Sequence, residues 1–193
     1  MPLTKIDVAE AQLSAAIRLY FADGHPVAVH TLACAAREIL SVLGQKLKMD
    51  TFLDDVARLR GLDVKEVRKK ATRFWNFMKH ADLDPTDVLE EFSDRDNDGI
   101  LFCACRDLAQ IAEGLPVEAQ VFEAWFFAIT VKRISAGGLR WQQKVKACIK
   151  LFPRVRSAPR ALQKQIGFRV LNDALKNPAL QMQMKRTVEL PTE

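Results

Sequence analysis

The chain has 193 residues, of which 49% are hydrophobic and 27% charged, and its formal net charge is +5. Such a chain can bury a sizeable core in one domain, or in a domain with an appendage, without disulfides or metals. The N-terminal MPLTKIDVAEAQ has no apolar run behind a basic start, and no stretch reaches the roughly 20 apolar residues of a membrane span. We therefore expect a cytoplasmic protein without a membrane partner.

The cysteine spacing argues against a zinc site. Cys34, Cys103, Cys105 and Cys148 do not form C-x-x-C pairs, and three of them fall in apolar helical patterns. We expect buried thiols in a reducing compartment, no metal site and no other cofactor.

The first part of the chain predicts a helical hairpin. Thr4 resembles a helix N-cap, and apolar residues then repeat at helical spacing until Gly24 and Pro26 break the pattern. An alanine-rich helix follows from about Pro26, with Gly44 as its predicted stop. Because the connection is short, the two helices are expected to pack antiparallel. A short helix from Asp50 or Thr51 to Leu59 comes next.

A further helix is predicted from Asp63 to about Ala81, since Asp63 and Glu66 have capping-box spacing. Val67, Ala71, Phe74, Met78 and Ala81 form its apolar stripe. The opposite side carries a polar row of Lys69, Arg73, Asn76 and His80. Arg73, Asn76 and His80, at i, i+3 and i+7, are candidate catalytic residues, because a guanidinium, an amide and an imidazole on successive turns can bind one anion and move protons near neutral pH.

A polar row opposite an apolar stripe is also what an ordinary surface helix shows, and this alternative stays open. His25, in a loop, and His30, beside an apolar row, are the only other imidazoles. Either one is able to join His80 in a site, although histidine is more often a structural residue of intermediate burial.

Residues 86–92 predict another turn or two of helix. The acids that follow, Asp94, Asp96 and Asp98, together with Gly99 match the first half of a calcium loop, but Cys105 stands where the bidentate carboxylate belongs. We expect these acids to cap the helix that begins near Ile100 rather than to bind calcium.

The next two helices are strongly apolar. Residues 100–113 predict a buried central helix, and the aromatic helix after Pro116 predicts either a packed core or an oligomer interface. The small residues Ser135–Gly138 are then expected to form a flexible joint. Beyond it we expect helices over Leu139–Phe152 and Arg160–Lys176. The fold class is therefore all-α: an up-and-down helical bundle over residues 1–134, and a basic helical extension over residues 139–193 that packs on the bundle or is appended to it.

Charge is distributed very unevenly along the chain. Residues 124–172 contain 11 Lys and Arg and no acid, whereas residues 1–123 contain 15 Lys and Arg and 21 Asp and Glu. This basic segment, interleaved with Trp141, Phe152 and Phe168, favours a nucleic-acid partner. Alternatively, the cations solvate helix faces or neutralise acids of the same or a neighbouring chain. The candidate nucleic-acid-binding residues are Lys69, Arg140, Lys144, Lys146, Lys150, Arg154, Arg156 and Arg160.

The alanine-rich hairpin followed by a helix bearing Arg73 and His80 resembles the HEPN superfamily of small helical proteins, whose signature is an Arg and a His a few residues apart. The resemblance covers about residues 8–130. It implies an up-and-down bundle, a homodimer with a cleft between subunits, and in many members a metal-independent RNase of toxin or defence type. By the motif, Arg73 stabilises the scissile phosphate, His80 transfers protons and Asn76 orients either. Phe74 stands where the family often has a polar residue.

The sequence thus predicts a nucleic-acid-binding helical protein, with RNA as the partner and RNA cleavage as a possible activity. The alternative is a non-catalytic protein-interaction or scaffold module that holds a protein partner through the aromatic surface of residues 122–127.

Overall fold

The computed structural model describes residues 2–80, 82, 85–112, 114–131 and 138–181, and over these ranges the chain forms helices and no strands. This confirms the all-α class. The helices in chain order are α1 (Lys5–Phe21), α2 (Pro26–Lys46), α3 (Phe52–Leu59), α4 (Val64–Lys79), α5 (Asp96–Ile111), α6 (Val117–Thr130), α7 (Leu139–Leu151), the 3-10 turn η1 (Val155–Ser157), α8 (Arg160–Leu175) and α9 (Pro178–Gln181).

Side-chain caps begin several helices where the sequence predicts them. Thr4 and Thr51 each close a capping box with the acid three residues later. Asp63 accepts hydrogen bonds from two backbone N–H groups in the first turn of α4. Because these caps satisfy donors that have no partner inside the helix, the first turns are defined locally.

The helix ends are also set locally, with one correction. Gly61 follows α3 with φ 65°, the left-handed conformation that closes a helix and that glycine adopts without steric cost. The stop predicted at Gly44 is wrong, since α2 continues to Lys46. The Met49 N–H donates to the Gly44 carbonyl at 2.8 Å and Lys48 takes φ 57°, so the closing turn lies beyond Gly44.

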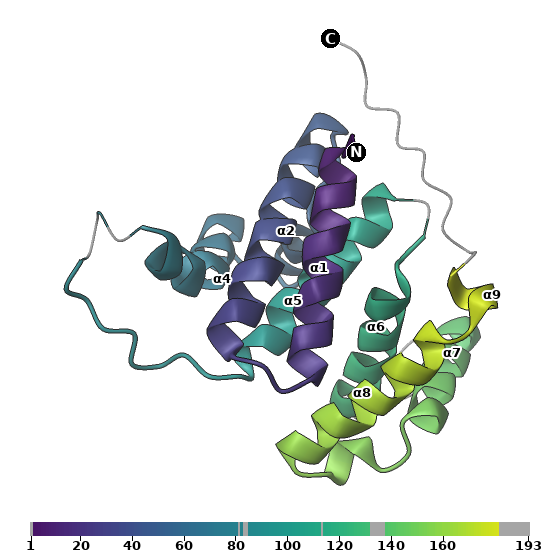
Figure 1. The fold of residues 1–193 in the computed structure, drawn as a ribbon. Coiled ribbons are helices and arrows are strands. Elements are labelled where there is room, and N and C mark those ends of the chain that lie inside the picture. Colours follow the sequence, from purple (N-terminus) through teal and green to yellow (C-terminus); the bar gives the residue numbers. More distant parts are fainter. Residues whose placement is uncertain (1, 81, 83–84, 113, 132–137, 182–193) are drawn as a thin grey trace.

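The core lies between the α1–α2 hairpin, α5 and α6. α1 and α2 run side by side as the predicted antiparallel pair (Figure 1), and α5 packs against α2. α5 is the buried central helix that the apolar run predicts. The large side chains that are fully buried in this core are Leu13, Ile17, Tyr20, Leu40, Leu101, Leu108, Phe122 and Trp125.

The aromatic residues of α6 form part of this core. Phe122 and Trp125 are fully buried and pack edge-on or tilted against Tyr20 and Phe21 of α1. The prediction that residues 122–127 form an exposed partner-binding surface is therefore wrong. The other reading of this stretch, a packed core, is the one that the structure confirms.

The basic C-terminal helices join the same core. Phe152, Val155 and Leu171 are buried within it, and the indole N–H of Trp125 donates to the Gln163 carbonyl at 2.9 Å. α7 and α8 both pack against α6. Of the predicted joint, Ser135–Gly138, the structure describes Gly138 alone; the other three residues lie outside the described ranges.

The segment from Pro85 to Phe92 differs from its prediction. A helix is predicted over residues 86–92, but the structure has turns and irregular chain there, and Figure 1 shows this segment as a loop that leads to the start of α5. Phe92 anchors this segment by packing edge-on against Phe74, with 5.1 Å between the ring centroids. Tertiary contacts therefore override the local helix propensity here.

By length and composition, α2 is the one described helix that meets the requirements of a bilayer span. Half of its most apolar stretch is buried inside the protein, as in a core helix. It packs against α1 on one side and α5 on another.

Candidate nucleic-acid interface

α4 is a cationic helix that lies on the outside of the bundle. It contains Lys65, Arg68, Lys69, Lys70, Arg73 and Lys79 against a single acid, Glu66, and none of its residues is buried. The helix packs against α3 and α2, but none of its residues becomes part of the fully buried core. In Figure 1 it forms an arm to one side of the α1–α2 pair. Most of its charge is therefore available to solvent.

An open groove of about 580 Å³ runs along the outward side of this helix. We call it the α4 groove; it is lined by Glu66, Lys69, Lys70, Arg73, Asn76, Phe77, His80 and Leu89. Four residues singled out from the sequence, Lys69, Arg73, Asn76 and His80, thus share one concave surface. The other four lining residues, Glu66, Lys70, Phe77 and Leu89, were not selected as site residues from the sequence.

Arg73 is exposed, but its guanidinium is not free. It lies 3.0 Å from the Glu91 carboxylate and 4.5 Å from the centroid of the Phe74 ring. Both partners carry substantial exposure, so the ion pair is a weak surface interaction that a phosphate is able to replace. Glu91 was not identified from the sequence, because it comes from the segment predicted to be helical.

His80 is the C-cap of α4, and its side chain is 40% exposed. Its Nδ1 atom lies 3.9 Å from the Asp82 carboxylate. His80 is therefore accessible at the C-terminal end of α4.

The predicted basic residues of the C-terminal segment divide into two groups. Arg140, Lys144, Lys146, Lys150, Arg154 and Arg156 are exposed. Lys144 also lies 4.0 Å from Glu123 and over the Phe127 ring, and Arg156 donates to the carbonyls of Ala128 and Val131. Among the aromatic residues expected to stack on bases, Phe152 is buried, whereas Phe168 is 40% exposed.

Arg160 has a different environment from that expected. It donates hydrogen bonds to Asp94 and Asp98, at 2.7 and 2.6 Å, and lies over the rings of Tyr20 and Trp125. These ion pairs raise its pKa even though burial opposes the charge. We therefore exclude Arg160 from the surface available to a nucleic acid.

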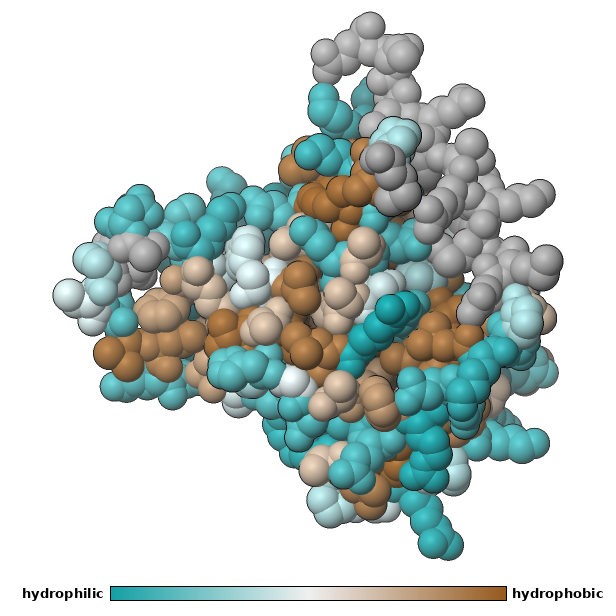
Figure 2. Space-filling model, in the orientation of Figure 1, coloured by the Kyte–Doolittle hydropathy of each residue, from teal (hydrophilic) through white to brown (hydrophobic). Residues whose placement is uncertain are grey.

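The two basic regions lie on opposite sides of the molecule. Figure 1 shows α4 on one side of the α1–α2 pair and α7 and α8 on the other. Hydrophilic side chains gather over α8 on the face shown in Figure 2. The 139–169 cations and the Arg73–His80 row therefore do not line one binding surface on a single chain.

The acids of the calcium-like stretch serve as counter-ions. Asp94 pairs with Arg160 and with Lys164, and Asp98 pairs with Arg160 and accepts from the Tyr20 hydroxyl at 2.5 Å. α5 begins at Asp96, which accepts from the N–H and hydroxyl of Ser93, so the stretch is helical where a calcium loop is irregular. Within the described ranges no three His, Cys, Asp or Glu side chains gather as a metal site does.

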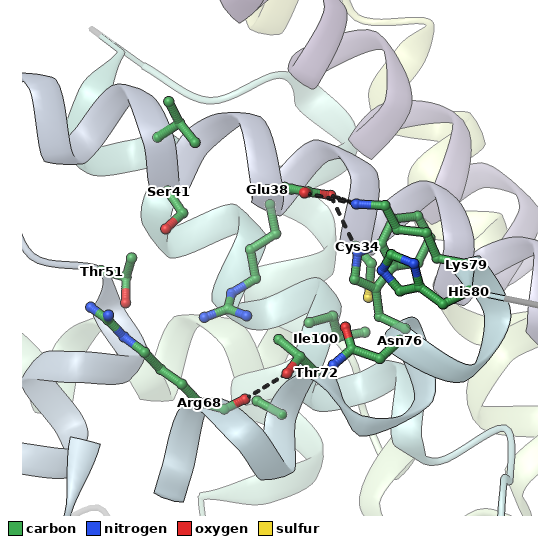
Figure 3. A pocket seen from close by; sticks show the side chains of 14 residues that line it. Cys34, Glu38, Ser41, Thr51, Arg68, Thr72, Asn76, Lys79, His80 and Ile100 are labelled. Atoms are coloured by element: carbon green, nitrogen blue, oxygen red, sulfur yellow. Dashed lines mark hydrogen bonds and ion pairs between the residues drawn. The ribbon is translucent and has the colours of Figure 1, made fainter. Parts of the chain in front are cut away.

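A second hollow separates α4 from α2. This α2–α4 pocket, of about 390 Å³, has Cys34, Arg37, Glu38, Ser41 and Val42 on the α2 side, Arg68, Ala71, Thr72, Trp75, Asn76, Lys79 and His80 on the α4 side, and Thr51 and Ile100 between. Figure 3 shows Arg68 beside Thr51 at one end, and Lys79 and His80 at the other. Glu38 accepts from Lys79 and from the Trp75 indole, at 3.0 and 3.2 Å.

Two of the buried polar residues around this pocket show marked electrostatic effects. Burial raises the pKa of the Cys34 thiol to about 12, so this cysteine is not an activated nucleophile. Burial also opposes ionisation of Asp54, but hydrogen bonds from Arg68 and Thr51 outweigh it and lower the Asp54 pKa.

The sequence analysis missed Arg37, because an isolated arginine in an amphipathic helix gives no sign of its burial.

Comparisons with known proteins add no assignment to this geometry. No protein-family model, no curated protein and no solved structure matches the chain.

Proposed function

We propose that this protein is a cytoplasmic nucleic-acid-binding protein that takes single-stranded RNA along the α4 groove. The observation that supports this most directly is the gathering of Lys69, Lys70, Arg73, Asn76 and His80 on one groove wall. Lysine and arginine neutralise phosphates at a spacing that does not depend on base sequence.

The groove has a length and a lining suited to a strand. Glu66 and His80, at its two ends, are 14 positions apart on one helix, which is about 21 Å at 1.5 Å per residue. Several nucleotides fit that distance. Phe77 in the same wall offers a ring on which a base can stack.

The second activity that we propose for this groove is metal-independent cleavage, as the HEPN resemblance implies. The 2′-hydroxyl attacks the phosphorus and loses its proton to a base, the P–O5′ bond breaks, and the leaving O5′ receives a proton from an acid. Arg73 stabilises the charge that develops on the phosphoryl oxygens. His80 is the imidazole able to act as base or acid.

Cleavage needs both an acid and a base at one phosphate, and the α4 groove of a single chain contains one imidazole, that of His80. Glu66 is about four helical turns away, too far to act with His80 on the same atom. A homodimer that brings two copies of His80 to one strand supplies both groups. This requirement supports the dimer that the resemblance implies.

The test is binding and cleavage by matched variants. Fluorescence anisotropy with a labelled RNA of mixed sequence, in EDTA, compares wild type with Lys69→Gln/Arg73→Gln and with the α7 control Lys146→Gln/Lys150→Gln. The α4 variant is expected to bind RNA more weakly. A plot of log affinity against log salt concentration should also become shallower by about 1.4, because each of the two lost phosphate contacts contributes about 0.7 to its slope. A loss confined to the α7 variant contradicts the α4 groove.

Cleavage is tested separately with purified wild type, Arg73→Ala and His80→Ala in EDTA. Activity that both variants lose supports the RNase. Equal activity in all three indicates a contaminating nuclease, and binding without cleavage leaves a non-catalytic nucleic-acid-binding protein. If wild type binds no RNA, the proposal fails.

A further inference from the structure

Unsatisfied polar atoms concentrate beneath α4. Of the four buried side-chain atoms that lack a hydrogen-bond partner in the described ranges, three are His30 Nε2, Arg37 Nε and Asp107 Oδ2. The fourth belongs to Gln12 in α1. His30 and Arg37 line the same cavity, and Arg37 Nε lies 3.4 Å from the Asp107 carboxylate. Arg37 Nε and Asp107 Oδ2 therefore face each other, and His30 Nε2 is the atom of the three that has no such partner in the described part of the chain. Because buried polar groups are nearly always satisfied, this nitrogen calls for a partner that donates a hydrogen bond.

The hydrogen bonds around His30 determine which of its ring nitrogens carries the proton. The Asn97 amide N–H₂ donates to the Pro26 carbonyl at 3.0 Å, so the Asn97 side-chain oxygen faces His30 Nδ1, 2.9 Å away. That oxygen can only accept, and Nδ1 therefore bears the hydrogen. In the neutral ring Nε2 is then an unprotonated acceptor with a free lone pair. Burial, at 2% exposure, lowers the His30 pKa and so favours this neutral form.

Arg37 is the opposite kind of group, a buried cation with donors. The residue is 9% exposed, and its Nε atom lies 3.4 Å from Asp107 Oδ2, in an ion pair whose alignment is poorer than that of a hydrogen bond. Burial raises the pKa of Asp107, which weakens its role as a counter-ion. A guanidinium presents five N–H donors in a fixed plane that matches oxyanions.

Arg37 lies between two hollows. On one side is the α2–α4 pocket, and on the other an inner cavity of about 250 Å³ that His30, Lys70, Phe74 and Gly99 help to line. Asp96 also lines the inner cavity, but its carboxylate already accepts from Ser93. The roof over both hollows is α4, which buries none of its own residues and is therefore the element best able to move aside.

A partner in the inner cavity must donate a hydrogen bond to His30 Nε2, and the buried Arg37 guanidinium on the same cavity favours one whose other atoms are negatively charged acceptors. A phosphomonoester does both, because its oxygens accept and its last proton dissociates with a pKa near 6. We propose that the hollows beneath α4 form a binding site for a small phosphomonoester, whose phosphoryl group lies between Arg37 and His30 in the inner cavity. Arg68, Lys79 and Trp75 of the α2–α4 pocket then surround the rest of the molecule.

The residues that define this site differ from those that define the proposed RNA groove. Arg37 and His30 do not line the α4 groove; the groove shares Asn76 and His80 with the α2–α4 pocket and Lys70 with the inner cavity. Loss of phosphate binding by a change at Arg37 therefore says nothing about RNA binding at Lys69 and Arg73, and each proposal can fail alone.

Isothermal titration calorimetry with inorganic phosphate and with sulfate, at pH 6.5 and equal ionic strength, tests the site. Sulfate offers acceptor oxygens but no proton, so it is expected to bind at least about tenfold more weakly than phosphate. Arg37→Met is expected to weaken phosphate binding by about tenfold or more, whereas the matched surface change Lys146→Met leaves it unaltered.

A measurement on the wild type keeps the test decisive if Arg37→Met fails to fold. The ¹⁵N resonance of His30 Nε2, assigned with a His30→Gln variant, is expected to move on addition of phosphate and to stay in place with sulfate. Absence of phosphate binding, equal affinity for the two anions, or a His30 signal that phosphate does not move overturns the proposal and leaves water in the cavity.

Discussion

The Arg73 guanidinium lies 3.0 Å from the Glu91 carboxylate, and this ion pair joins α4 to the extended segment that leads into α5. Glu91 thus pairs with the guanidinium that, in the proposed function, binds an RNA phosphate. Glu91, 18 residues further along the same chain, therefore competes with an RNA phosphate for the Arg73 guanidinium.

Glu91→Gln is expected to increase RNA affinity by about two- to fivefold, because it removes a weak exposed ion pair that a phosphate must displace. The salt dependence of binding should become steeper as Arg73 gains a phosphate contact. Anisotropy titrations at several salt concentrations measure both. Glu90→Gln, at the exposed neighbouring acid, is the control: an equal gain there means that net charge alone, and not release of Arg73, is responsible.

A pair of glycine substitutions tests how closely α8 packs on α1. A Cβ at Gly167 would lie 2.2 Å from the Phe21 ring, whereas a Cβ at Gly99, in α5, would meet nothing within 4 Å. Gly167→Ala is expected to destabilise the fold by about 1–3 kcal/mol through overpacking. Gly99→Ala should instead stabilise it by about 0.5–1 kcal/mol, since alanine favours the helix. Urea unfolding of both variants measures the change in the free energy of unfolding, which should be a decrease for Gly167→Ala and an increase for Gly99→Ala. No change in Gly167→Ala would mean that α8 does not pack this closely on α1.

The ion pairs between α8 and the acids before α5 predict that removing an acid destabilises the fold more than removing its cation. Lys164 is 2% exposed and pairs with Asp94 and, at 3.0 Å, with Asp23. Asp94→Ala leaves buried cations without their main counter-ion and is expected to cost about 3–5 kcal/mol. Lys164→Met, which removes the buried charge and keeps the volume, should cost much less. Equal losses in urea unfolding would contradict this account.

The same network predicts acid sensitivity. Burial opposes the charge on Asp94, but Lys164 and Arg160 outweigh it and lower its pKa from 3.8. Because the folded state lowers this pKa, the stabilisation is complete above about pH 4 and is lost as pH falls through the lower folded value. Circular dichroism across pH 5 to 2 should show wild type losing stability more steeply than Asp94→Asn. Parallel curves would mean that Asp94 does not drive acid unfolding.

Local sequence signals predicted most of the fold. Thr4, Thr51 and Asp63 define helix starts through contacts within three residues, and periodicity predicts which helix faces are buried. The same periodicity predicted that Lys69, Arg73, Asn76 and His80 share one side of α4, and they line one groove.

The errors came from partners distant in the chain. Arg160 was predicted to contact a nucleic acid, but its counter-ions Asp94 and Asp98, 66 and 62 residues away in the chain, pair with it inside the fold. The burial of Arg37 likewise depends on Asp107 in another helix. Residues 86–92 form no helix, and Phe92 packs instead against Phe74 of α4, a contact that no local pattern predicts. Pairing across the fold therefore decided which charges face solvent.

The environment of His30 predicts a pH dependence near neutrality. Burial lowers the pKa of His30, although the hydrogen bond to Asn97 and the charge of Asp96 partly oppose this. Since the folded state prefers the neutral ring, the unfolded chain takes up the proton first, near pH 6.5. The free energy of unfolding should therefore be highest above this pH and fall as the pH drops towards the folded pKa. Urea unfolding at pH 7.5 and 5.5, in phosphate-free buffer, is expected to show a smaller difference between the two pH values in His30→Gln than in wild type. The same change at half-exposed His80 is the control, and a wild-type difference that His30→Gln retains in full would assign the proton uptake to another group.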